Sequence, residues 1–320
     1  MPGKPGKQIM STGVVTKENY VQRNAGQKAE FHHTIGATVA EILPDGTFFC
    51  RQIKIGRDGS FQDLDILVRD GRIEQAPPVE AITFGDLHFE ALDHEKAKAS
   101  WGWPNVSGSM VEVLRPKWQF IHDSFDFTAR NHHTRNDPHE RVARLAEGQD
   151  SVRDMLAGTA AFLSAISSQT SPVVHIGSNH NDAMTRWLKD PSGLSDPVNA
   201  RLWCELNAAQ IAAIEDGDKD FDIHAHALKL CGHDLSDVIF VRAGESFVVC
   251  QGIHPIECGL HGHAGPRGAR GSITGFSKIV ERTNIGHSHE PNIREGAYQA
   301  GTSSRLDLPY ATKEIGRAHV

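Results

Sequence analysis

Histidine and aspartate recur directly after apolar, strand-like segments of this 320-residue chain. It has 19 histidines against three tyrosines, and histidine is the commonest metal ligand. Five segments place imidazole, carboxylate or amide groups within or after an apolar run: ITFGDLH (82–88), QFIHD (119–123), VVHIGSNH (173–180), CGLHGH (258–263) and NIGHSH (284–289). Carboxylate, imidazole and amide oxygen together suit Mn²⁺, iron or Zn²⁺ better than Ca²⁺. The pattern therefore predicts a metal site.

The elements that must position these groups alternate between short strands and amphipathic helices. Strands are expected at 81–85, 118–122, 172–176, 238–241, 246–253 and 259–261, and helices at 138–166, 182–190, 197–215 and 269–282. Such alternation predicts an α/β layered fold, in which ligands bind beyond the carboxyl ends of the strands. Because a strand end holds its side chain rigidly, we expect the five segments to converge on one site.

The first 78 residues differ in character from the rest of the chain. Residues 1–30 are polar and are expected to form a flexible arm, with nucleic-acid contact as the alternative to a solvated tail. Residues 31–78 are expected to form a β-meander extension, because Asp-Gly pairs at 45–46, 58–59 and 70–71 mark turns. The alternation of strands and helices then covers 79–313.

Composition limits the class of protein. The formal net charge is −7, and 39% of the residues are hydrophobic, which is ordinary for a globular protein. No apolar run approaches the roughly 18 residues of a membrane span, and the N-terminus lacks a signal-peptide core. The five cysteines form no C-x-x-C pair, which predicts reduced thiols in the cytoplasm. The negative charge argues mildly against non-specific DNA binding, although divalent ions, a local basic loop or an oligomer would compensate.

The ordered series D-x-H, strand-end Asp, N-H, H-G-H and G-H-x-H resembles the calcineurin-like metallophosphoesterase superfamily over residues 80–310. The resemblance implies an αββα sandwich with two divalent metal ions, Mn²⁺ first and iron, Zn²⁺ or Mg²⁺ as alternatives. It assigns Asp86, His88 and His289 to one ion, Asn179, His261 and His287 to the other, and Asp123 to both. A metal-bridging hydroxide would attack phosphorus, and His180 would stabilise the transition state and protonate the leaving oxygen.

Three residues depart from the usual pattern of that superfamily. His122 stands where a glycine usually precedes the bridging aspartate, and Ser178 is inserted before Asn179. Asn181 follows His180 where an acidic residue is common. None of these changes removes a ligand, but each alters the surroundings that would orient His180.

Longer stretches resemble a narrower family, the DNA-transfer proteins of T5-like phages and their prophage relatives. They are residues 114–123, 130–133, 261–272 and 286–291. That family is associated with the degradation of host DNA, so the resemblance implies a DNA phosphodiesterase acting in the bacterial cytoplasm.

Some polar residues outside the ligand series are candidates for substrate contact. They are Arg130, Asn131, His132, His133, His263 and Arg267. The alternatives are a solvated polar face at 130–133, a role in loop structure for His263 and a simple turn around Arg267. His175 lies inside a strand and is expected to be a core or sheet-face histidine.

The sequence thus predicts a metal-dependent phosphoester hydrolase, with a two-metal phosphodiesterase or DNase as the first hypothesis. The alternatives are a phosphomonoesterase or protein phosphatase, and a non-catalytic DNA-binding transfer factor. The last residues, EIGRAHV (314–320), resemble a translated sequencing adapter. We therefore expect 314–320 to be a non-native tail and the sandwich to lack its final strand.

Overall fold

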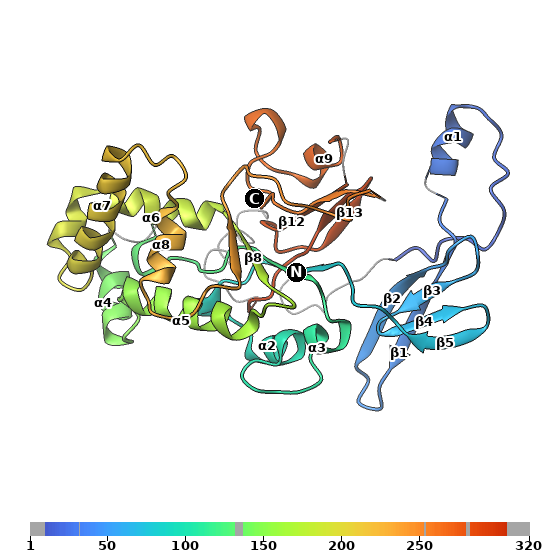
Figure 1. The fold of residues 1–320 in the computed structure, drawn as a ribbon, viewed down its shortest axis with the longest axis horizontal. Helices are drawn as coiled ribbons and strands as arrows, with labels where there is room; N and C mark the ends of the chain where they lie inside the picture. The colour runs from blue at the N-terminus through green and yellow to red at the C-terminus, as the bar shows by residue number, and fades with distance from the viewer. Residues whose placement is uncertain (1–9, 32, 132–136, 253, 280–281, 306–320) are drawn as a thin grey trace. The chain divides into compact units, whose positions relative to one another are not determined.

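The computed structural model describes residues 10–31, 33–131, 137–252, 254–279 and 282–305 (Figure 1). The chain divides into two compact units, residues 1–78 and 79–320. The division falls where the residue pattern changes from closely spaced turns to alternating strands and helices. The expected non-native tail, residues 314–320, lies outside the described residues, and the expected lack of a final strand stays a prediction.

The first unit contains two small antiparallel sheets. Helix α1 (Asn24–Phe31), which begins in the expected arm, precedes the hairpin of β1 (Gly36–Ile42) and β2 (Phe48–Lys54). Strands β3 (Phe61–Asp63), β4 (Ile66–Arg69) and β5 (Arg72–Gln75) form a meander. The Asp-Gly pairs lie in three of the connections, where each glycine adopts the positive φ that such turns require.

The second unit is built on a four-stranded parallel sheet. Its strands, in the order β6-β7-β8-β9, are β6 (Ala81–Thr83), β7 (Trp118–Ile121), β8 (Val173–Ile176) and β9 (Val238–Val241). All three neighbouring pairs are parallel. The carboxyl ends of the strands therefore meet at one edge of the sheet, as the alternation of elements predicts.

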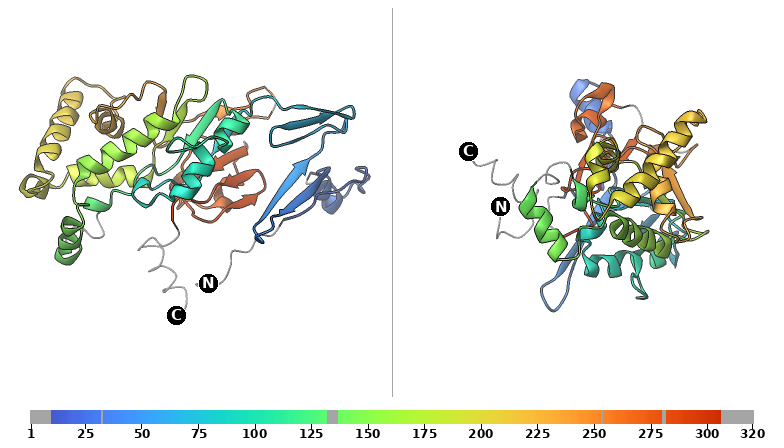
Figure 2. Two further views of the ribbon diagram at one scale, coloured as in Figure 1. Left: turned by 90° about the horizontal axis from the view of Figure 1, so that it is seen from below. Right: turned by 90° about the vertical axis from the view of Figure 1, so that its left-hand side faces the viewer.

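Helices connect these strands, and several of them pack on one face of the sheet. The connecting helices are η1 (Phe89–Ala91), α2 (His94–Trp101), α3 (Met110–Leu114), η2 (Thr128–Arg130), α4 (Pro138–Ala146), α5 (Val152–Ile166), α6 (Asn179–Leu188), η3 (Pro191–Ser195), α7 (Ala200–Glu215) and α8 (Ile223–Lys229). The main hydrophobic core joins Ile121, Val173 and Val238 of the sheet to α5, α6, α7 and α8. Figure 2 shows these helices in green and yellow at one end of the unit.

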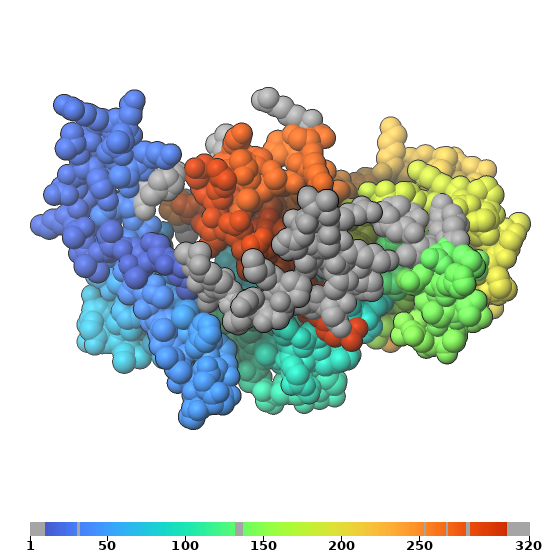
Figure 3. Space-filling model, turned by 180° about the vertical axis from the view of Figure 1, so that it is seen from behind, coloured from blue at the N-terminus to red at the C-terminus, as the bar shows by residue number. Residues whose placement is uncertain are grey.

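A second, five-stranded mixed sheet packs on the other face. Its strands, in the order β10-β11-β12-β14-β13, are β10 (Val248–Val249), β11 (Ile256–Glu257), β12 (Arg282–Ile285), β14 (Ala297–Gln299) and β13 (Asn292–Arg294). Phe120 and Val174 of the parallel sheet pack with Val249 and Cys258, because alternate residues of a strand face opposite sides. Seen from behind, the orange and red residues of this region form a continuous surface (Figure 3).

Several expected elements differ from the observed ones. The single helix expected at 138–166 is two helices, because Gly148 adopts a φ of +71° and the chain turns there. The helix expected at 269–282 is reduced to the turn α9 (Ile273–Phe276), after η4 (Pro266–Gly268). Gly271 lies so close to the Gly262 carbonyl oxygen that a Cβ would be 1.6 Å away. Strand 246–253 shrinks to β10, and 259–261 is not a strand.

The mixed α/β class with a parallel sheet is confirmed. None of the helices in the described ranges combines the length and the hydrophobicity that crossing a lipid bilayer demands.

Candidate metal centre

The expected metal ligands follow the ends of β6, β7, β8 and β12. Asp86 and His88 lie after β6, and Asp123 lies two residues after the end of β7. Asn179 and His180 begin α6, whose N-cap is Ser178, the inserted residue of the sequence pattern. His287 and His289 follow β12, and His261 lies between β11 and η4. The parallel sheet brings the segments after β6, β7 and β8 to one edge, and the mixed sheet supplies the segments of His261, His287 and His289 to the same place.

Three of these positions have a left-handed backbone. His88 has a φ of +42°, Asp123 of +41° and His287 of +69°. The first two turns are joined by a hydrogen bond of 2.7 Å, which the His88 N–H donates to the Asp123 carbonyl oxygen. Asp and His tolerate this conformation better than most residues, and backbone strain of this kind gathers at functional sites.

Asp123 occupies the centre of the cluster. Its Oδ2 lies 3.2 Å from Nε2 of His261, 3.8 Å from Nε2 of His180 and 4.0 Å from Nε2 of His88. The same Nε2 of His261 is 3.0 Å from Oδ1 of Asn179. Side chains from three neighbouring strands and from the second sheet's connection thus point their ligand atoms at one carboxylate.

Asp86 forms the other half of the cluster. Its Oδ2 lies 3.6 Å from Nε2 of His289, which is 3.1 Å from Nε2 of His88. Its Oδ1 accepts a 3.0 Å hydrogen bond from the backbone N–H of His287. The His287 ring lies beside His261, with 5.4 Å between the ring centroids. Gly286 is required here, because a Cβ would lie 2.4 Å from Oδ1 of Asp86.

These residues fit divalent cations. Three groups have ligand atoms within 4.8 Å of one another: Asp86, His88 and His289; His88, Asp123 and His180; and Asp86, Asp123 and His261. Oδ2 of Asp86 and Oδ1 of Asp123 are buried with no hydrogen-bond partner in the part of the chain that the structure describes. Buried carboxylates without a partner are costly unless a cation neutralises them. The donor set is the mixture of oxygen and imidazole that Mn²⁺, iron and Zn²⁺ accept.

Electrostatics distinguish the two aspartates. Burial, together with the charge of Asp123, raises the pKa of Asp86 to about 6. Burial also raises the pKa of Asp123, but the neighbouring His261 and His180 outweigh it and hold that pKa well below its ordinary value. Burial and neighbouring imidazoles lower the pKa values of His287 and His289 to about 4, so both rings carry a lone pair at neutral pH.

His180 is held by an aspartate that the sequence analysis missed. Nδ1 of His180 lies 2.9 Å from Oδ1 of Asp126. Burial alone would lower the pKa of His180, but the charges of Asp123 and Asp126 outweigh it and raise that pKa to about 10. Glu90 in turn fixes Asp126 by accepting its backbone N–H at 2.8 Å. The D-x-x-D spacing after β7 is the sequence signal that could have identified Asp126.

The rings of a second group of buried histidines, His175 and His224, contact neutral side chains. Nε2 of His175 is 2.7 Å from the Ser124 hydroxyl, and Nδ1 of His224 is 2.9 Å from the Asn181 amide nitrogen. The two rings lie 4.9 Å apart. Burial lowers the pKa of His175 to about 4, which fits the expected core role. Asn181 therefore binds His224 where an acidic residue would have introduced a buried charge.

The candidate substrate residues have different surroundings. Arg130 is buried and pairs with Asp150 at 2.9 Å and with Asp196, so its guanidinium is used inside the fold. Asn131 is half-buried, and the half-buried His263 ring lies 5.3 Å from that of His261. His132, His133 and the side chain of Arg267 lie outside the described residues.

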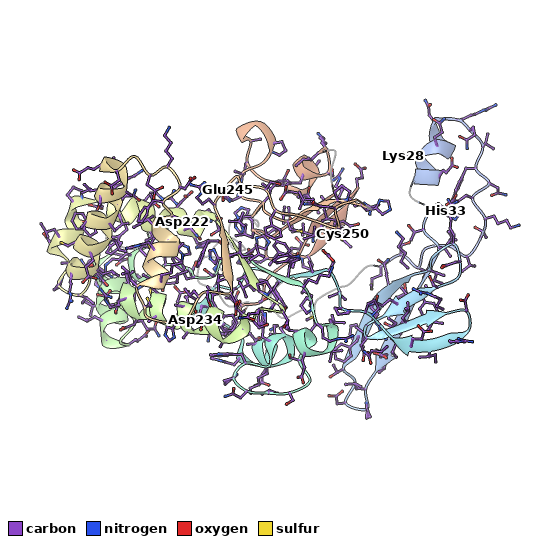
Figure 4. The ribbon with its side chains drawn as sticks, in the orientation of Figure 1. Lys28, His33, Asp222, Asp234, Glu245 and Cys250 are labelled. Atoms are coloured by element: carbon purple, nitrogen blue, oxygen red, sulfur yellow. The ribbon has the colours of Figure 1, made fainter. Side chains whose placement is uncertain are left out.

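A cavity of about 570 Å³ lies apart from the cluster. Residues of α8, β9 and the adjoining loops line it, among them Asp222 and Glu245, which Figure 4 labels. It contains none of the expected metal ligands.

Comparison with known proteins adds one match. The chain is 38% identical over 314 residues to Protein A1 of Escherichia phage T5. It is a homologue of that phage protein. The alignment covers 97% of this chain and 55% of Protein A1, so the chain spans about half the length of the relative it matches. No family model and no solved structure matches the chain.

Proposed function

We propose that the chain is a metal-dependent phosphoester hydrolase of the calcineurin-like superfamily. The proposed substrate is a phosphodiester, with DNA as the first candidate, and the proposed location is the bacterial cytoplasm. The observation that carries the proposal is the meeting of histidines, Asn179 and two incompletely partnered aspartates at one edge of the parallel sheet. The DNA substrate rests on the resemblance to phage DNA-transfer proteins.

The packing of the second unit supports the layered αββα sandwich of that superfamily. Helices cover one face of the parallel sheet, and the mixed sheet packs on the other. Phe276 of the short turn α9 packs with Ile285 and Ala297 of the mixed sheet.

The proposed ligands form two sets around Asp123. Asp86, His88 and His289 would hold one ion, and Asn179, His261 and His287 the other. Two divalent ions, Mn²⁺ first, polarise phosphoryl oxygens and make water nucleophilic at neutral pH. The chain's own contribution is to hold these ligand atoms rigidly on strand ends and in tight turns.

The open side of the cluster indicates where the substrate binds. His88 and Asp123 are almost fully buried, whereas the His180 side chain is 16% exposed and that of His289 is 25% exposed. We place the phosphate on this side. Asp126 holds Nδ1 of His180, so Nε2 faces the cluster and is the atom that would give its proton to the leaving oxygen.

Hydrolysis of bis-p-nitrophenyl phosphate with added Mn²⁺ tests the proposal, with p-nitrophenyl phosphate and linear and circular DNA assayed alongside. We expect Mn²⁺-dependent turnover that EDTA abolishes and that favours the diester. Faster turnover of the monoester would identify a phosphomonoesterase instead. Bound metal without hydrolysis of any of these esters would overturn the enzymatic function.

A further inference from the structure

His122 is a buried histidine that the proposed reaction does not use. It follows β7 and directly precedes Asp123, and its side chain contacts no solvent. Its Nδ1 lies 3.4 Å from Nδ1 of His261. The other ring nitrogen of His261, Nε2, is the atom that faces Asp123 and Asn179. His122 therefore contacts the far side of an expected metal ligand.

The contact between the two rings has only one arrangement that allows metal binding. Two imidazole nitrogens share a hydrogen bond only when one carries a hydrogen and the other a lone pair. A metal ion bound at Nε2 of His261 would need the lone pair of that nitrogen. The hydrogen of the neutral His261 ring would then reside on Nδ1. Nδ1 of His122 is then the acceptor, and the hydrogen of His122 resides on Nε2.

His122 also packs against the segment that carries His287. A Cβ on Gly286 would lie 2.8 Å from Cγ of His122, so the ring and this backbone are in close contact. The Gly286 N–H donates a 2.8 Å hydrogen bond to the His261 carbonyl oxygen. The His122 side chain therefore touches both segments that supply imidazoles to the second ligand set.

Packing alone does not require an imidazole at this position. Nε2 of His122 is buried and has no hydrogen-bond partner among the residues that the structure describes. A buried donor without an acceptor destabilises the folded state, and an aliphatic side chain of similar size would avoid that cost. The imidazole supplies what an aliphatic residue cannot, namely an acceptor for Nδ1–H of His261.

We propose that His122 is a positioning residue that acts on one ion of the pair. It fixes the tautomer and the orientation of His261, and so supports the ion that Asn179, His261 and His287 would hold. The ion that Asp86, His88 and His289 would hold is independent of it. The inference rests on the proposed two-metal site. Loss of such a partner weakens metal affinity by about 10- to 100-fold.

The test is a titration of the EDTA-treated chain with Mn²⁺. Binding is measured by calorimetry and by the electron paramagnetic resonance signal of free Mn²⁺. His122→Leu keeps the volume but removes the acceptor, and His122→Asn places an amide oxygen near the position of Nδ1. We expect the wild type and His122→Asn each to bind two Mn²⁺ ions. We expect His122→Leu to keep one at wild-type affinity and to bind the other about 10- to 100-fold more weakly.

His175→Leu is the matched control. It removes a buried histidine that pairs in register with Ile121 on the neighbouring strand, and whose Nε2 lies 2.7 Å from the Ser124 hydroxyl rather than beside an expected ligand. We expect this variant to bind both ions as the wild type does. If His122→Leu does not fold by circular dichroism, His122→Gln, whose amide reaches the position of Nε2 instead, takes its place with the same expectation.

Three results would overturn the role of His122 while leaving the metal site intact. The first is an unchanged affinity for both ions in His122→Leu, and the second is an equal decrease of both affinities in that variant. The third is a decrease in His175→Leu or His122→Asn as large as that in His122→Leu. A wild-type chain that binds no Mn²⁺ would overturn the two-metal proposal itself, and the positioning role with it.

Discussion

Two pairs of buried aspartates in the second unit have opposite surroundings. Asp150 and Asp196 both pair with the guanidinium of Arg130, so the chain supplies their cation. Asp86 and Asp123 face imidazoles, and each has one oxygen without a hydrogen-bond partner in the described ranges. The first pair ties η2 to the starts of α5 and α7. The second pair lies at the sheet edge, where histidines face it and none of the described arginines or lysines forms an ion pair with it.

One member of each pair shows how the surroundings act on the pKa. Burial alone would raise the pKa of Asp196, but the charge and hydrogen bond of Arg130 outweigh burial, so the pKa of Asp196 lies below its ordinary value. Burial and the charge of Asp123 raise the pKa of Asp86 to about 6. Burial of a carboxylate is therefore not in itself a sign of a metal site. The sign is a buried carboxylate oxygen that has no hydrogen-bond partner among the described residues, as at Asp86 and Asp123.

The largest expected effect is on catalysis. Asp123→Asn removes the charge at the centre of the cluster but keeps its shape, so we expect Mn²⁺-dependent diester hydrolysis to fall by about 10³-fold or more. Circular dichroism should show an intact fold. The matched change in the other pair, Asp150→Asn, should lower stability while turnover per folded molecule stays near that of the wild type. Equal activity loss in both variants would refute the distinction between the pairs.

The next effect is on stability. Arg130→Ala leaves two buried carboxylates without their cation, and we expect a loss of about 3–5 kcal/mol in the free energy of unfolding, measured in urea. Arg130→Met, which keeps the packing, should lose less than Arg130→Ala. If stability were unchanged and KM for the diester rose instead, Arg130 would contact the substrate, as the sequence analysis considered.

Added metal should stabilise the folded protein by binding at the second pair of aspartates. A ligand at 100 times its Kd raises the free energy of unfolding by about 2.7 kcal/mol, because only the folded state binds it. We expect a Mn²⁺-dependent increase of this size in the wild type and none in Asp123→Asn. A similar increase in both proteins would place the bound Mn²⁺ elsewhere.

The smallest effect concerns pH in the presence of EDTA. The folded-state pKa of Asp86 is about 6 against an ordinary value of 3.8, so the folded state binds more protons between these values. The stability from protonated Asp86 is therefore present near pH 4 and is lost as the pH rises through about 6.

Asp86→Asn cannot ionise and should not show this loss. Its melting temperature relative to the wild type should rise by at least about 2 °C from pH 4 to pH 7 in EDTA, measured by calorimetry. A difference that does not change with pH would show that Asp86 titrates normally.

The sequence predicts the centre of the site better than its surroundings. Asp86, Asp123 and Asn179 follow apolar runs, and parallel pairing brings such positions to one edge without any detail of packing. The partners of Arg130 could not be predicted, because Asp150 and Asp196 are 20 and 66 residues away and approach only when the helices pack. Asp126 lies three residues after Asp123 and was within reach of a spacing argument.

The helix boundaries show a similar limit. Apolar periodicity continues across 138–166, but it does not register that Gly148 ends α4. At 269–282 the deciding contact is between the backbones of Gly271 and Gly262, which no local pattern records.

The left-handed turns at His88, Asp123 and His287 restrict how this site can change. Branched side chains such as valine, isoleucine or threonine are strained at a positive φ, so a mutational library would lose these variants before metal binding was ever assayed. Asparagine tolerates the same conformation and could be exchanged there at little conformational cost. Evolutionary routes away from this chemistry therefore pass through very few amino acids.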